Sequence, residues 1–130
     1  MKIRFLSLLL VFAGIYNYLS AQVNYDTLLI GVWKGSSICQ IKKSPCHDET
    51  VVYYISKKPG IDTFYINAYK IVHGVEEEMG KLPFTLHKKI NQLISTSYRF
   101  WTFTIKQQQM EGTPVSKGTL YSIINLTKQH

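Results

Sequence analysis

The stretch "TVVYYISKKPGIDTFYINAYKIVH", residues 50–73, decides the fold class. Its two halves, 50–57 and 62–73, are rich in β-branched and aromatic residues, which are typical of strands. Between them stands the pair Pro59-Gly60, in which proline fixes one φ angle and glycine accepts the next, as a tight turn requires. The stretch therefore predicts an antiparallel β-hairpin.

Runs of the same kind continue along the chain, and no helical stripe of useful length interrupts them. We expect eight strands, at residues 31–40, 50–57, 62–73, 79–88, 91–97, 99–106, 108–114 and 118–127. Residues 25–30 are expected to form a short helical turn. The segment 73–83, which contains three consecutive glutamates, is expected to be a loop. Links this short join antiparallel neighbours, so the pattern indicates an all-β meander.

A meander of this length must protect its two edge strands, and closure into a barrel removes both edges. We therefore expect an all-β fold, an eight-stranded antiparallel up-and-down barrel, whose interior is either packed solid or holds one small ligand. In the run 99–106 the alternate residues Trp101, Phe103 and Ile105 are expected to share the core face. In the run 62–73 both faces contain apolar residues, so its inward face stays open.

The first residues of the chain have the order of a secretory signal peptide. Lys2 and Arg4 precede about 15 apolar residues, and small residues follow. A membrane-spanning helix needs roughly 20 apolar residues, so no membrane span is expected. We expect a cleaved signal peptide at 1–21, one domain at 22–130, and a secreted or periplasmic location.

The expected mature chain has 13 basic and 8 acidic residues, a formal charge of +5. Its lysines are scattered in pairs rather than clustered, and Arg99 is its one arginine. Nucleic-acid binders usually gather their charge on one face, so no nucleic-acid partner is expected. Gln22 stands where a lipoprotein would carry a cysteine, so no lipid anchor is expected either.

Cys39 and Cys46 are expected to form a disulfide, because the chain has an export signal. The bridge would close a loop of eight residues and stabilise the fold by roughly 2.5 kcal/mol. Oxidised sulfurs cannot bind zinc, which leaves His47, Asp48 and Glu49 in this segment. At most two of these converge on a strand, whereas a catalytic zinc needs three protein ligands, so no metal site is expected.

The polar residues near the second cysteine do not indicate catalysis. The serines close to His47 are not in a G-x-S-x-G elbow, so no catalytic residue, no cofactor and no enzymatic activity is expected. Asp48 and Glu49 are expected to accept hydrogen bonds from backbone N–H groups of the turn, or to pair with Lys42 and Lys43.

The segment "IGVWKG", residues 30–35, resembles the G-x-W start of the lipocalins and the wider calycin superfamily, with Gly31 and Trp33 in the motif positions. The resemblance implies an eight-stranded barrel in which the tryptophan plugs one end and the other end admits hydrophobic ligands. Lipocalins usually have an arginine near the last strand that packs on this tryptophan. Here the last expected strand is followed by Lys128 and contains no arginine.

A second pattern is similar to that of small exported bacterial proteins without an assigned activity. It reads W-x-G-x-S-x-C and then C-H-D-E-x-V-x-Y, and its residues here are Trp33, Gly35, Ser37, Cys39, Cys46, His47, Asp48, Glu49, Val51 and Tyr53. The resemblance implies a lipocalin-type barrel and brings no further chemistry.

Aromatic side chains supply the candidate ligand site, because rings with a few polar tips are the usual lining of small-molecule pockets. The residues expected to bind a ligand are Trp33, Tyr53, Tyr65, Tyr69, Arg99, Trp101 and Phe103. The first hypothesis is non-enzymatic binding of a small hydrophobic or amphipathic molecule in the barrel. The alternative is a secreted protein-binding module or enzyme inhibitor with a solid core and a protein partner.

Overall fold

The computed structural model describes residues 22–43, 45–95, 97 and 100–130. The expected signal peptide and Arg99 lie outside these residues. The described part of the chain contains the helix α2 (Tyr25–Leu29), the 3-10 turn η2 (Lys88–Ile90) and the strands β1 (Gly31–Cys39), β2 (Glu49–Lys57), β3 (Thr63–Val72), β4 (Val75–His87), β5 (Gln92–Ser95), β6 (Phe100–Lys106), β7 (Gln109–Ser116), β8 (Thr119–Leu120) and β9 (Ser122–Lys128). The helical turn expected at 25–30 is confirmed.

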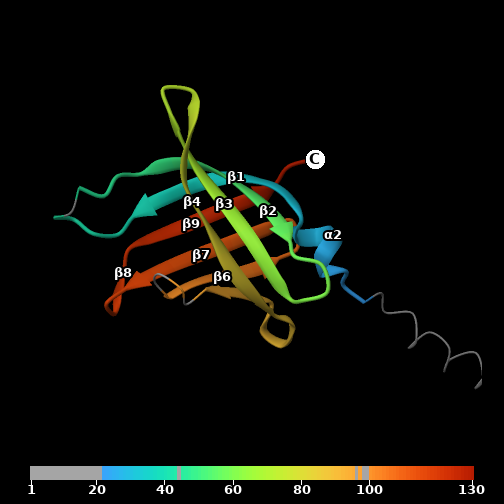
Figure 1. Cartoon of the computed structure of the whole chain (residues 1–130). Helices are drawn as coiled ribbons and strands as arrows, with labels where there is room; N and C mark the ends of the chain where they lie inside the picture. Colours follow the sequence, from blue (N-terminus) through green and yellow to red (C-terminus); the bar gives the residue numbers. More distant parts are fainter. Residues whose placement is uncertain (1–21, 44, 96, 98–99) are drawn as a thin grey trace, which may run out of the picture.

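The strands close into a barrel through a pairing between β6 and β7. The hydrogen-bonded order is β6-β5-β4-β3-β2-β1-β9-β7-β8, and each pairing is antiparallel. Because β6 also pairs with β7, eight of the described strands form a closed cylinder, and the two-residue strand β8 pairs beside β7 (Figure 1). The expected all-β fold, an eight-stranded antiparallel barrel, is confirmed.

The two ends of the barrel differ. The helix α2 covers one end, and the opposite end carries the loop between β1 and β2 and the turn between β7 and β8 (Figure 1). We call these the helix end and the open end. The hairpin of β3 and β4 projects from the barrel beyond its neighbours (Figure 1).

Alternate residues of the strands form the core inside the barrel. The largest side chains with almost no exposed surface are Trp33, Tyr53, Phe64, Phe84 and Phe103. On β6, Phe103 and Ile105 are buried and Trp101 packs against the same cluster. The core face predicted for this strand is therefore confirmed.

The structure shows which face of β3 points into the barrel, a choice that the sequence alone did not settle. Phe64, Ile66 and Ala68 are buried in the barrel, whereas Tyr65 and Tyr69 are half-buried on the opposite face. The two tyrosines therefore do not line the barrel interior.

The segment 73–83, expected to be a loop, is mostly a strand. β4 begins at Val75, and only His73 and Gly74 separate it from β3. Both have positive φ angles, 50° and 78°, as a two-residue hairpin turn of type I′ requires. The expectation of a loop is therefore wrong, because the turn that matters is the His73-Gly74 pair and the glutamates lie on the strand that follows.

The last expected strand, 118–127, is also corrected. It is divided at Tyr121 into β8 and β9, so that β8 pairs with β7 while β9 pairs with β1 and β7. At the division the Tyr121 N–H donates to the Pro114 carbonyl at 2.9 Å. One extended run thus supplies two strands.

The expected disulfide between Cys39 and Cys46 is present, with Cα atoms 5.8 Å apart. Asp48 Oδ1 accepts a hydrogen bond from the Cys39 N–H at 2.9 Å, so the predicted role of this carboxylate in the turn is confirmed. Glu49 instead lies 3.8 Å from Lys70 on β3, because β2 and β3 are neighbours, and not beside Lys42 or Lys43 as expected. The segment is a covalently closed loop at the open end.

Candidate functional site

The helix end of the barrel is plugged by Trp33, which has no exposed surface. Its Nε1 donates to the Leu29 carbonyl at 2.9 Å, which ties the strand β1 to the last turn of α2. On the neighbouring strand β9, Lys128 Nζ donates to the carbonyls of Thr27 and Leu28 at 2.5 and 2.7 Å. Together these contacts fasten α2 to the barrel, and the buried Trp33 ring fills the interior at this end.

Free space inside the barrel lies toward the open end, between β3, β4 and β6. A pocket of about 390 Å³ is present there. Its lining residues are mainly apolar, and they are Ile66, Ala68, Met79, Gly80, Lys81, Leu82, Phe84 and Trp101. Specific small-molecule pockets have volumes of roughly 300–1,000 Å³ and mostly apolar walls, so the size and lining suit a small ligand.

The pocket exists because small residues stand opposite each other on two long strands. Ala68 on β3 pairs with Gly80 on β4, and the register shifts directly after this pair. A shift of this kind is a β-bulge, which bends a strand locally. The space that larger side chains would fill is left open beside Leu82 and Phe84.

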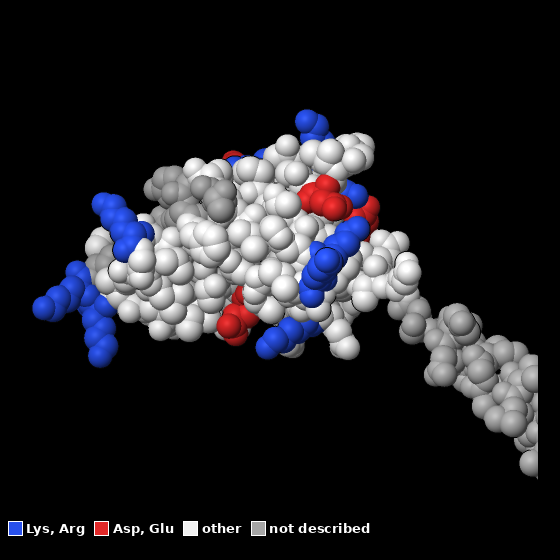
Figure 2. Space-filling model, turned by 90° about the horizontal axis from the view of Figure 1, so that it is seen from below, with Lys and Arg blue, Asp and Glu red and all other residues white. Residues whose placement is uncertain are grey.

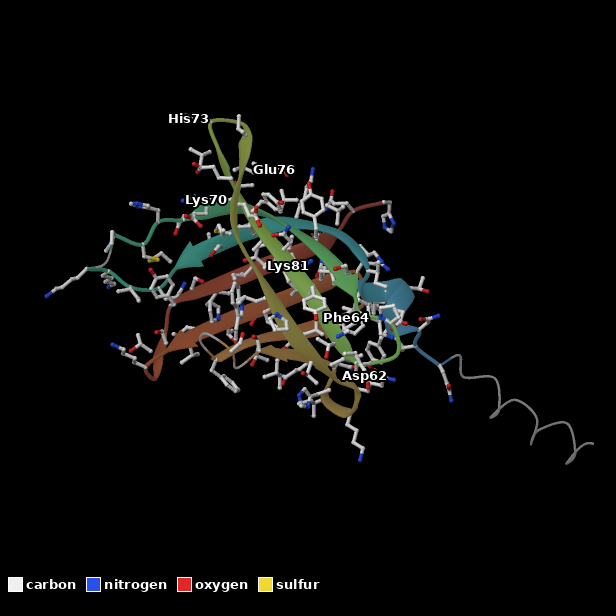
Figure 3. All side chains as sticks on the ribbon, viewed as in Figure 1. Asp62, Phe64, Lys70, His73, Glu76 and Lys81 are labelled. Atoms are coloured by element: carbon white, nitrogen blue, oxygen red, sulfur yellow. A yellow bond between two sulfur atoms is a disulfide. The ribbon has the colours of Figure 1, made fainter. Side chains whose placement is uncertain are left out.

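The wall of the barrel is also incomplete on the other side of β4. This strand pairs with β5 through Thr85, Leu86 and His87 alone, so residues 75–84 have no partner strand on that edge among the described residues. Lys81 lies on this part of β4, where the strand crosses the barrel below the hairpin tip at His73 (Figure 3). The pocket thus has access to solvent at the side of the open end.

Trp101 forms the aromatic wall of the pocket. Its ring stacks on Phe103, with centroids 5.6 Å apart, and meets Phe84 and Tyr53 edge-on at 5.8 and 6.3 Å. Aromatic pairs at these separations hold each other in place, so the wall is pre-formed. The Trp101 Nε1 atom is buried and has no hydrogen-bond partner among the described residues.

Tyr53 lies beneath this wall and is almost fully buried. Burial raises the pKa of its hydroxyl above the ordinary value, and the nearby Glu49 carboxylate raises it further. The raised pKa means that the Tyr53 hydroxyl stays uncharged to a higher pH than an exposed tyrosine.

The structure separates the residues that the sequence predicted as one ligand site. Trp33, Tyr53, Trp101 and Phe103 face the interior, but of these Trp101 alone is in the wall of the pocket. Trp33 plugs the opposite end, and Tyr53 and Phe103 pack beneath. Arg99 lies outside the described residues.

The two other predicted residues, Tyr65 and Tyr69, lie on the outer face of the barrel. Lys81 Nζ is 5.2 Å from the centroid of the Tyr65 ring, and the Tyr69 ring meets that of Tyr54 edge-on at 5.3 Å. They make surface contacts instead of lining the interior, because adjacent residues of a strand point to opposite faces.

Ile66, Ala68, Leu82 and Phe84 are pocket residues that the prediction missed. The sequence contains one partial signal for them, the alternation of Leu82, Phe84 and Leu86 along the end of β4. Alternation shows that these side chains share a face, but it does not show that Ala68 and Gly80 meet across two strands.

A larger groove of about 820 Å³ lies at the helix end, beside the start of α2. Val23 and His130, near the two ends of the described chain, form part of its walls. Most of its other lining residues belong to α2, to the ends of β6 and β9 and to the turn between β6 and β7, so the groove lies on the outside of the plugged end. We assign the candidate site to the pocket at Trp101, because that pocket opens into the barrel interior.

No group of three or more His, Cys, Asp and Glu side chains in the described residues could hold a metal ion. No helix among them is long and apolar enough to cross a membrane.

Comparison of the chain with protein-family models gives no match, and comparison with curated proteins gives no significant match. The closed eight-stranded antiparallel barrel is consistent with the lipocalin-like fold that the G-x-W resemblance implies.

Proposed function

We propose that this protein binds a small apolar or amphipathic molecule in the pocket at the open end of its barrel. The observation that carries the proposal is the apolar space of about 390 Å³ bordered by Ala68, Phe84 and Trp101. Its volume is sufficient for a compact ligand, and burying an apolar ligand there is favourable by about 25 cal/mol per Å² of apolar surface.

The polar groups at the pocket indicate which ligands suit it. The indole N–H of Trp101 is buried without a partner among the described residues, and a buried donor is stabilised when it gains an acceptor. The Lys81 ammonium lies over the Tyr65 ring on the outer face, 5.2 Å from the ring centroid, so it is not directed into the pocket. A molecule with an apolar body and one carbonyl or hydroxyl acceptor would complement the Trp101 donor.

The proposed role is non-enzymatic, requires no cofactor and is exerted outside the cytoplasm. The Cys39–Cys46 disulfide supports this compartment, because disulfides persist in oxidising environments. The signal peptide expected at 1–21 would bring the chain there. We also propose that the protein is a lipocalin-like barrel, because eight of its described strands close into a barrel and the buried Trp33 plugs one end.

The alternative, a protein-binding module with a solid barrel, is less well supported. The interior is solid at the helix end and in the middle, where Trp33, Phe64 and Phe103 have no exposed surface. The space next to Ala68 and Trp101 favours ligand binding over a protein-binding module with a solid core, because side chains would fill this space in a solid core.

The proposal is tested by titrating the protein with decanol, decanoate and indole while tryptophan fluorescence is followed. Binding of at least one of them should change the emission of Trp101. Ala68→Phe puts a ring into the pocket and should weaken binding by roughly tenfold or more, which corresponds to about 1.4 kcal/mol.

The matched control, Thr85→Phe, adds the same ring on the exposed outer face of β4 and should bind like the wild type. Leu82→Phe serves as a second pocket variant, and thermal unfolding verifies that each variant folds. Wild-type protein that binds none of the compounds, or an Ala68→Phe variant that binds them unchanged, would overturn the proposed function.

A further inference from the structure

An apolar strip crosses the outer face of β6, β7 and β8 at the open end. Phe100 pairs with Val115, and Val115 pairs with Leu120. Directly paired residues of antiparallel strands point to the same side of a sheet, and the next pair, Trp101 with Pro114, faces inward. Phe100 and Leu120 are 53% and 36% exposed, so the strip presents apolar surface to solvent.

A second apolar pair lies on the other side of the same end. Ile38, which is 39% exposed, pairs with Ile123 across β1 and β9. The loop that follows Ile38 is joined to the segment after β8, because the Gln40 N–H donates to the Tyr121 carbonyl at 3.0 Å. The exposed apolar residues thus belong to one end of the molecule.

Three lysines border these apolar residues. Lys42 and Lys43 lie in the loop between β1 and β2, and Lys117 lies in the turn between β7 and β8. None of them forms an ion pair with another described residue. Figure 2 shows Lys and Arg atoms gathered at the end of the molecule away from the chain start, with no acidic atoms beside them in that view.

The two acidic side chains next to the loop between β1 and β2 are already engaged. Asp48 accepts the hydrogen bond from the Cys39 N–H, and Glu49 faces Lys70. Glu76, Glu77 and Glu78 lie apart from this loop, on the projecting hairpin of β3 and β4 (Figure 1). The unpaired charge on the loop and turn next to the strip is therefore positive.

From this arrangement we infer that the open end docks on an anionic lipid bilayer. Phe100, Leu120 and Ile38 would enter the boundary between headgroups and acyl chains, and the three lysines would contact the anionic headgroups. Apolar residues that protrude between flexible cationic side chains suit this interface, since a lysine keeps its charge at headgroup level while its stem lies along apolar surface. A protein partner would need no such combination of protruding apolar residues with lysines on separate loops.

The docking needs no ligand in the pocket and is independent of the proposed function. If both hold, the pocket at Trp101 lies at the end of the barrel that faces the bilayer. An amphipathic molecule would then have a short route between membrane and pocket.

The inference is tested by co-sedimentation of the chain from Gln22 onward, which contains all elements of the barrel, with lipid vesicles. Pure phosphatidylcholine vesicles are compared with vesicles that also contain phosphatidylglycerol. The protein should bind the anionic vesicles, bind the neutral ones much more weakly, and dissociate as salt is added. Each lysine near an anionic surface contributes about fivefold to the partition coefficient, so the Lys42→Gln, Lys43→Gln, Lys117→Gln triple variant should bind about a hundredfold more weakly.

The control triple variant removes the same charge from the helix end, through Lys58→Gln, Lys89→Gln and Lys106→Gln, and should bind nearly like the wild type. A Phe100→Ser, Leu120→Ser variant keeps the lysines and should also lose binding.

Circular dichroism verifies that each variant folds. If both triple variants lost the same amount of vesicle binding, net charge alone would explain the effect and the inference would be wrong. Absence of binding to anionic vesicles would also overturn it and would leave the strip to a protein partner.

Discussion

Trp33 and Lys128 both join α2 to the barrel at the helix end. The G-x-W resemblance placed Trp33 at a plugged end, and the structure finds it fully buried there. Lys128 was noted only because lipocalins have an arginine in this region. Its contacts with the Thr27 and Leu28 carbonyls depend on a meeting of the last strand with a helix about 100 residues earlier, which local pattern does not reveal.

Lys128 is expected to stabilise the helix end, because its ammonium group satisfies two backbone carbonyls at once. Lys128→Met keeps the aliphatic stem and removes both hydrogen bonds, and should lower the free energy of unfolding by about 1–2 kcal/mol. Urea denaturation measures this loss. Lys128→Arg should retain most of the stability, and Lys89→Met, at an exposed position, should cost almost nothing. A Lys128→Met variant as stable as the wild type would show that the helix end is held without this contact.

For Tyr65 and Tyr69, the composition of β3 limits what alternation can predict about the inward face of the strand. Both faces of β3 carry apolar residues, so alternation gave two sets and no means to choose between them. The choice is made by packing, because Phe64, Ile66 and Ala68 meet the core while the tyrosines meet Lys81 and Tyr54 outside.

At the level of elements, the N-terminal half of β4 was missed for a physical reason. Glu76, Glu77 and Glu78 are poor strand formers, and no buried alternation marks this segment because it projects beyond the barrel. It is a strand because its backbone pairs with β3 and because the Tyr54 hydroxyl donates to Glu76 Oε1 at 2.8 Å. The disulfide loop, by contrast, was predictable, since a loop closed by two nearby cysteines is a local feature.

The loop between β1 and β2 is expected to owe much of its order to the disulfide. Replacing Cys39 and Cys46 with serine should lower the free energy of unfolding by about 2.5 kcal/mol, because the unfolded chain regains the entropy of an open loop. Urea denaturation of wild type and variant under oxidising conditions measures the difference.

Reductant supplies the matched control for the same bridge. Wild-type protein in reductant should unfold at the same urea concentration as the variant, and the variant should be insensitive to reductant. Equal stability of oxidised wild type and variant would contradict a stabilising role of the bridge.

At the level of the whole molecule, closure of the barrel could be predicted because eight short strands without a cover must remove their edges. The position of the free space could not. It depends on which residues of β3 and β4 pair and on how few residues β5 shares with β4, and both are set by long-range register. The result is a barrel that is solid near α2 and hollow near Trp101.

Native mass spectrometry of the protein, purified without denaturation from the cells that make it, tests most directly whether this hollow holds a small molecule. The wild type should carry added mass that is lost on denaturation, and the Ala68→Phe variant, whose new ring fills the pocket, should not. A wild-type protein that shows only the mass of its chain, or an Ala68→Phe variant that retains the same added mass, would contradict ligand binding in the barrel.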